Sequence, residues 1–165
     1  MKRILYRMVA AVCLAAGALL FAAPAFAGEN DAYIASMPQG KIDLVEQNVV
    51  LALTSGIPGM QADAAQLVRD LKDIRPEQSF TACIRPLMGI LKNEEADQSS
   101  RILAAFALDR LGSTMGDFAI SRTALFTDNQ KVKHVCTWLA YEKRTGRSAD
   151  SKGMAIIEPL EEFGY

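Results

Sequence analysis

Histidine and cysteine are scarce in this chain of 165 residues, which contains one histidine, His134, and three cysteines. Cys136 is the cysteine nearest to His134 in the sequence. On a helix with 3.6 residues per turn the two side chains diverge by about 200°. They therefore cannot both point at one metal ion, as two of the four donors of a zinc site must. As a catalytic base, His134 needs a nucleophile beside it, and the chain has no Gly-x-Ser-x-Gly motif. We therefore expect no metal and no catalytic residue, and interpret His134 as a surface or packing residue.

Organised phosphate-binding and acidic motifs are also lacking. Residues 56–59 form a Gly-Ile-Pro-Gly turn without the lysine that phosphate-binding loops use. Glu94, Glu95 and Asp97 share one turn, and carboxylates suit calcium, but their spacing is not the Asp-x-Asp-x-Asp-Gly of a calcium loop. We interpret this segment as a solvated turn and expect no cofactor.

The one long apolar run lies near the N-terminus and indicates a secretion signal. Three cations precede an apolar stretch over residues 8–21, and Ala25-Phe26-Ala27 supplies the small-x-small pattern that signal peptidase accepts. We predict a signal peptide over residues 1–27 and an exported protein, periplasmic or secreted. An uncleaved membrane anchor is the alternative, against which Pro24 and the cleavage pattern argue.

Cleavage would change the charge of the protein. Removing the signal's three cations from the 18 basic residues leaves 15 against 19 acidic ones, a net charge of −4. Binding of a phosphate backbone needs a concentrated cationic footprint, so nucleic acid is not an expected partner. No second membrane-length apolar run follows, so we expect no membrane insertion after signal cleavage.

Two cysteines, Cys83 and Cys136, follow the predicted cleavage point. An exported chain with an even cysteine count permits a disulfide. The two residues are 53 positions apart, a loop for which the chain-entropy account gives roughly 4 kcal/mol of stabilisation. Two buried, unpaired thiols are the alternative.

Strand patterns are weak, and apolar residues recur at spacings of three and four, which predicts an all-α protein. Six helices are predicted, over residues 42–54, 60–71, 79–92, 99–111, 116–125 and 129–143. The clearest apolar stripe comprises Phe80, Cys83, Ile84, Leu87, Ile90 and Leu91. Pro86 lies within that helix and favours a kink or a later start near Arg85. We expect Gly112 to end the fourth helix in a left-handed conformation and Asp128 to cap the sixth.

Small residues recur in the second helix of each consecutive pair, at Ala64-Ala65, Ala104-Ala105 and Cys136-Thr137. Their spacings of 40 and then 32 residues indicate three helical hairpins of irregular period, because stacked helices approach closely only where side chains are short. An ordinary six-helix bundle is the alternative.

These patterns divide the remainder of the chain into three parts. A flexible N-terminal segment is predicted over residues 28–40, the helical repeat domain over 41–146, and a C-terminal tail over 147–165. Four apolar residues of this tail are suited to docking on the domain: Ile156, Ile157, Leu160 and Phe163. Pro159 limits any helix there.

The middle hairpin resembles a HEAT repeat. The resemblance is carried by residues 84–95 and 100–112, since such repeats pair an apolar first helix with a second helix that has small residues and a basic residue, here Arg101, near its start. Residues 48–71 and 118–141 resemble degenerate copies, in which Leu71 aligns with Leu111, and Lys133 with Arg101. The resemblance implies a short α-α superhelix of about three HEAT-like hairpins. Because HEAT proteins commonly act as scaffolds, it also implies a protein partner, and it transfers no catalytic residue.

The last predicted helix carries two aromatic residues, Trp138 and Tyr141, offset from its apolar stripe. With Lys133 and Arg144 they have the composition of a binding hot spot, and we predict a protein-binding surface there; core packing is the alternative. The predicted function is that of a non-enzymatic protein-binding or scaffold protein of the cell envelope. The alternatives are a small carrier of an apolar ligand and a small envelope enzyme with a carboxylate site.

Overall fold

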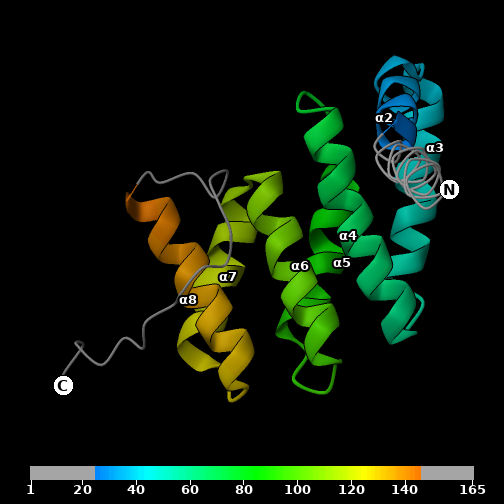
Figure 1. Ribbon diagram of the computed structural model, residues 1–165. Helices are drawn as coiled ribbons and strands as arrows, with labels where there is room; N and C mark the ends of the chain where they lie inside the picture. The colour runs from blue at the N-terminus through cyan, green and yellow to red at the C-terminus, as the bar shows by residue number, and fades with distance from the viewer. Residues whose placement is uncertain (1–24, 146–165) are drawn as a thin grey trace, which may run out of the picture.

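The computed structural model describes residues 25–145, with side chains from Asn30 onward, and in this range it contains helices and no strands. The helices are α2 (Ala25–Ser36), α3 (Gln39–Leu53), α4 (Pro58–Ile74), α5 (Thr81–Lys92), α6 (Gln98–Leu111), α7 (Thr114–Phe126) and α8 (Gln130–Thr145) (Figure 1). The all-α prediction is confirmed, and both ends of each of the six predicted helices lie within three residues of the observed bounds. The predicted signal peptide, apart from residues 25–27 in α2, and the predicted tail lie outside the described residues.

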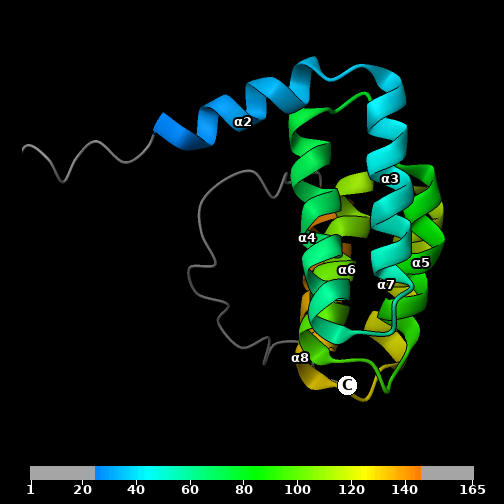
Figure 2. The same ribbon diagram turned by 90° about the vertical axis from the view of Figure 1, so that its right-hand side faces the viewer.

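Three consecutive helical hairpins, α3/α4, α5/α6 and α7/α8, are stacked side by side. The first helices pack in the order α3, α5, α7 and the second helices in the order α4, α6, α8, which gives two layers (Figure 2). The core lies between the layers and between neighbouring hairpins, so each hairpin shares its apolar side with the next. The stack therefore has two ends, one at α3/α4 and one at α7/α8.

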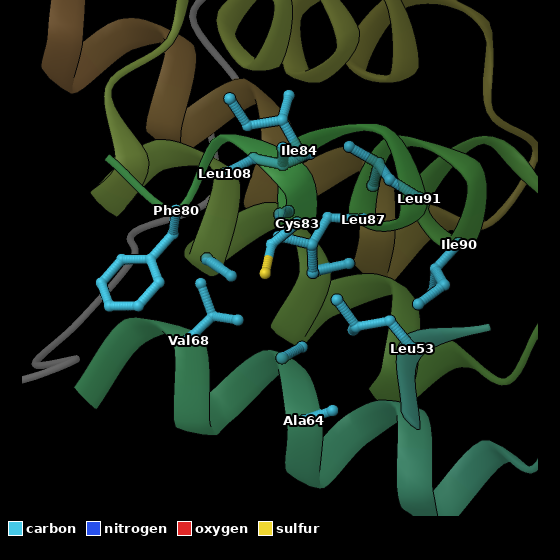
Figure 3. Packing of buried hydrophobic residues seen from close by; sticks show 14 of the residues in the cluster. Leu53, Ala64, Val68, Phe80, Cys83, Ile84, Leu87, Ile90, Leu91 and Leu108 are labelled. Atoms are coloured by element: carbon cyan, nitrogen blue, oxygen red, sulfur yellow. The ribbon is translucent and has the colours of Figure 1, made fainter. Parts of the chain in front are cut away.

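Short side chains lie where second helices meet. Ala64 and Ala65 of α4 and Ala104 and Ala105 of α6 are all buried, which lets these two helices approach closely (Figure 3 shows Ala64 beneath the middle hairpin). In α8 only the first member of the pair, Cys136, is buried, and Thr137 faces solvent. α8 is the last second-layer helix of the described stack, so no following helix covers this side.

Helix α5 begins at Thr81 and continues through Pro86, so the later start near Arg85 is not observed. Its predicted stripe is buried throughout. Phe80, just before the helix, has a left-handed backbone with φ 45°, which is strained for a bulky residue. Its ring is 1 % exposed and lies beside Val68 (Figure 3), and burial of such a ring, worth about 1.5–3 kcal/mol, offsets the strain. Glu46 of α3 accepts a hydrogen bond from the Ala82 amide, which otherwise lacks a helical partner.

The helix ends follow local side-chain chemistry. Gly112 ends α6 with φ 64°, as predicted. The cap of α8 is Asn129 rather than the predicted Asp128, because the Asn129 Oδ1 accepts hydrogen bonds from the amides of Lys131 and Val132 at 3.1 and 3.2 Å. Asp and Asn are similarly good caps, so the residue type alone did not distinguish these neighbours.

Helix α2 was not predicted, and it occupies most of the segment assigned to the flexible lead-in, residues 28–40. It contacts α4, and Arg75 at the end of α4 donates hydrogen bonds from Nη1 to the carbonyls of Ile34 and Met37. These two carbonyls lie at or beyond the C-terminal turn of α2, where the backbone lacks helical partners. A residue some forty positions away thus fixes the end of this helix, which a local pattern does not reveal.

Candidate functional site

The acids of the turn before α6 are exposed, as expected for a solvated turn, and one of them, Glu94, also takes part in a polar network. Arg101 is 1 % exposed, and its Nη1 and Nη2 donate hydrogen bonds to the two carboxylate oxygens of Glu94 at 2.8 and 2.7 Å. Its Nε donates to the Leu91 carbonyl at 3.1 Å, and Nη2 also donates to the Thr127 hydroxyl at 3.0 Å. Thr127 in turn donates to Glu94 at 3.1 Å. The network joins the turn of the middle hairpin to that of the last.

The remaining acids of this turn have separate roles. Asp97 caps α6 by accepting hydrogen bonds from the amides of Ser99 and Ser100, and Glu95 faces solvent. The hydrogen bond from Arg101 lowers the pKa of Glu94, so this carboxyl is ionised at neutral pH. Within residues 25–145, no His, Cys, Asp and Glu side chains gather closely enough to hold a metal ion.

The second perturbed carboxyl, Asp109, lies at the other end of α6. Burial raises its pKa, and the neighbouring Lys143, Asp117 and Arg110 also act on it. The 14 residues of α6 span about 21 Å, and they separate Asp109 from Glu94. The two carboxyls with shifted pKa values therefore do not form the paired acid and base that a carboxylate-based enzyme needs.

The single histidine is on the outside of α8. His134 is exposed whereas Cys136, two positions on, is buried, as the helical angle between them predicts. The solvent-facing alternative for His134 is thus observed.

The expected Cys83–Cys136 disulfide is not present; both thiols are free and buried. Figure 3 shows the Cys83 sulfur on the side of α5 that faces α4, and Glu46 of the first hairpin lies near enough to influence its pKa. Cys136 lies instead near Arg101, on the other side of the middle hairpin. Cys83 thus lies between the first and the middle hairpin, and Cys136 between the middle and the last hairpin. The spacing of the two cysteines along the chain does not reveal this separation. Burial raises the pKa of each thiol to about 12.

The four residues of the predicted binding surface all lie on α8. Lys133, Tyr141 and Arg144 follow at spacings of eight and three, which places them on one stripe. Tyr141 and Arg144 are exposed and Lys133 is half-buried. Trp138 is also half-buried, because its indole packs edge-on against Phe106 of α6 with ring centroids 6.3 Å apart. The structure therefore places three of the four residues on one stripe, with Trp138 fixed beside them.

Sequence analysis missed a second exposed surface, on α7. Met115, Phe118, Leu125 and Phe126 are large apolar residues exposed on this helix. The spacing of three between Met115 and Phe118, and of seven between Phe118 and Leu125, was a usable signal. It was obscured because α7 also carries apolar residues on its buried side, such as Ile120.

Together the fold and the surfaces define the class of this protein, an all-helical stack of three hairpins with exposed apolar residues on its end helices. No protein-family model, curated protein or solved structure matches the chain. Among the described residues, no helix is both long and apolar enough to cross a bilayer.

Proposed function

We propose that this chain is a non-enzymatic protein-binding or scaffold protein of the cell envelope, built on HEAT-like repeats. The localisation rests on the signal peptide predicted over residues 1–27. The HEAT-like character is supported by consecutive hairpins in two layers, with paired small residues in the second helices. Such stacks offer rows of parallel helices as extended binding surfaces.

The observation that carries the proposal is the surface of α8. Tyr141 is 43 % exposed, and Arg144 lies one turn further along the same stripe. Beside them Trp138 packs edge-on against Phe106, and this contact restricts the orientations of its ring. Tyr, Trp and Arg are the residues most often found at binding hot spots, and a fixed aromatic ring loses little conformational freedom on binding. The surface thus suits a protein partner with an apolar pocket and acidic groups around it.

The experiment is photo-crosslinking in cells from a benzophenone side chain at position 141, followed by affinity measurement with the purified partner. Because each tenfold change in Kd corresponds to about 1.4 kcal/mol, loss of two hot-spot side chains in Tyr141→Ala with Arg144→Ala should raise Kd at least tenfold. Trp138 is left unchanged because its loss would also disturb α6.

The matched control is Tyr33→Ala, which removes another exposed tyrosine, from α2. It should leave Kd unchanged. Equal affinity in the α8 double variant and the Tyr33 variant would contradict the proposed surface.

A further inference from the structure

The outer side of α7 carries large exposed apolar side chains. Phe118 is 61 % and Leu125 is 71 % exposed, and Met115 and Phe126 lie at the two ends of the helix. Terminal repeats of such stacks normally carry a polar outer side that keeps the stack from associating. Apolar side chains here therefore call for a cover.

One cation lies within this apolar side. Arg122 is the only basic residue of α7, and its guanidinium carbon lies 5.1 Å from the centroid of the Phe126 ring. This cation–π contact fixes the charge on the outer side of the helix. A suitable cover is therefore apolar and carries negative charge.

The chain beyond α8 has this composition. Its last ten residues contain Ile156, Ile157, Leu160 and Phe163. They also contain three glutamates, Glu158, Glu161 and Glu162, and no basic residue.

The connection has the required reach. Lys143 of α8 forms an ion pair with Asp117 of α7, so the C-terminal end of α8 lies beside the N-terminal end of α7. Ile156 follows Thr145, the last residue of α8, by eleven positions, and eleven residues span up to about 40 Å when extended. The 13 residues of α7 are about 20 Å long. Every point on the helix is thus within reach of the chain end.

We propose that the chain's own C-terminal segment, residues 156–163, packs on the outer side of α7 and covers Phe118 and Leu125, with its glutamates around Arg122. The apolar side chains of this segment would then shield the apolar side of α7 from solvent at this end of the stack. The inference is independent of the proposed partner surface on α8.

The first test uses two matched leucines. Leu125 near the end of α7 is 71 % exposed, and Leu51 near the end of α3, at the opposite end of the stack, is 68 % exposed. If the tail covers α7, Leu125→Ser lowers the Tm by about 4 °C, while Leu51→Ser changes it by less than 1 °C. Equal shifts for the two variants would overturn the proposal.

A double-mutant cycle connects the helix to the tail. Leu160→Ser should lower the Tm as much as Leu125→Ser, and the double variant should lower it no further than either single variant, because both remove the same contact. Additive shifts would mean that the two leucines do not interact, and would overturn the proposal.

The identity of the cover is tested by a benzophenone side chain in place of Phe118 in the purified protein. The expected crosslink is intramolecular, maps to residues 156–163 and has a yield independent of protein concentration. A crosslink between two copies, with a yield that rises with concentration, would assign α7 to self-association instead. That result, or the absence of any crosslink to residues 156–163, would overturn the proposal.

Discussion

The first and the middle hairpin each use a side chain near the start of the second helix to satisfy a carbonyl at the end of the first helix. In the first hairpin Gln61 Nε2 donates a hydrogen bond to the Leu53 carbonyl at 3.1 Å, and in the middle hairpin Arg101 Nε donates to the Leu91 carbonyl, also at 3.1 Å. Both carbonyls belong to the last turn of a helix, where backbone carbonyls lack N–H donors from the helix itself. The position is the same, and the chemistry differs.

The difference lies in what else each side chain holds. Gln61 closes its own hairpin, and other side chains link the first hairpin to the next. Among these links is the hydrogen bond from the buried Ser100 hydroxyl to the Pro58 carbonyl, at 2.9 Å. Arg101 closes its hairpin and also reaches Thr127 between α7 and α8. A guanidinium has five donors in a fixed fork, so one residue can do both. We therefore expect the middle hairpin to be the more sensitive to loss of its side chain.

The largest effect is expected from Arg101→Ala. This change removes the hydrogen bonds to the Leu91 carbonyl and to Thr127, and it opens a space in the core where the side chain was 1 % exposed. Truncating a large buried side chain to alanine typically costs about 2–5 kcal/mol, and we expect a loss of this size in the free energy of unfolding, measured by urea denaturation. The control Arg85→Ala removes an exposed arginine and should cost less than 1 kcal/mol. Similar losses for the two variants would contradict the central role of Arg101.

The next largest effect is expected from the two buried thiols, Cys83 and Cys136, on the pH dependence of the free energy of unfolding. Cys136 extends the comparison to the last hairpin. The pKa of each thiol is about 12 in the folded protein against an ordinary value of 9.0. Above pH 9 the unfolded chain releases thiol protons that the folded protein retains, so the free energy of unfolding falls with pH. The slope is about 1.4 kcal/mol per pH unit for each thiol.

The difference between the natural protein and Cys136→Ala should therefore change by about 1.4 kcal/mol between pH 9.5 and 10.5, measured by urea denaturation. Cys83→Ala should behave alike, and each effect should disappear below pH 8. A pH-independent difference would show that the thiols are bonded or already ionised. Alkylation of the unfolded chain without reductant distinguishes these, because two free thiols each take one alkyl group.

Much of this organisation could be predicted from the sequence, because apolar periodicity records which side of each helix avoids water. The buried stripe of α5 and the end of α6 at Gly112 were predicted correctly. The burial of Cys136 was also predicted, from its place on the apolar stripe of its helix, whereas His134 had been interpreted as either a surface or a packing residue.

The polar and long-range features could not be predicted in this way. Glu94 and Arg101 are seven positions apart across a turn, and only the fold brings them together, so their ion pair was not predicted. Each cysteine lies between a different pair of hairpins, and this follows from the order in which the hairpins stack. The end of α2 is likewise set by a distant residue, Arg75 at the C-terminal end of α4. The outer side of α7 was missed because a helix that is apolar on both sides shows no clear stripe.

A smaller effect is expected from Glu94→Gln, which keeps the shape of the turn and removes the charge opposite Arg101. The Glu94 side chain is 48 % exposed, so solvent screens the pair and the expected loss at pH 7 is about 1 kcal/mol. The pKa of Glu94 is lowered from 4.5 in the folded protein, so its contribution is complete above that value and is lost as the pH falls through the folded pKa. Urea denaturation at pH 7 and pH 3 should show the difference between variant and natural protein shrinking at the lower pH. Growth of the difference on acidification would reverse the assigned sign.

The smallest effect is expected from Gln61→Ala, the counterpart of Arg101→Ala in the first hairpin. It removes one neutral hydrogen bond from a half-buried amide. The net value of such a bond is about 0.5–1.5 kcal/mol, so urea denaturation should place the loss several-fold below that of Arg101→Ala.

The substitution Gln61→Arg sharpens the comparison. No acidic residue occurs in the turn of the first hairpin, residues 54–57, so an arginine there has no counterpart of Glu94. We expect that variant to be no more stable than the natural protein. A gain above 1 kcal/mol would show that the guanidinium alone, rather than its pairing with Glu94 and Thr127, accounts for the strength of the middle hairpin.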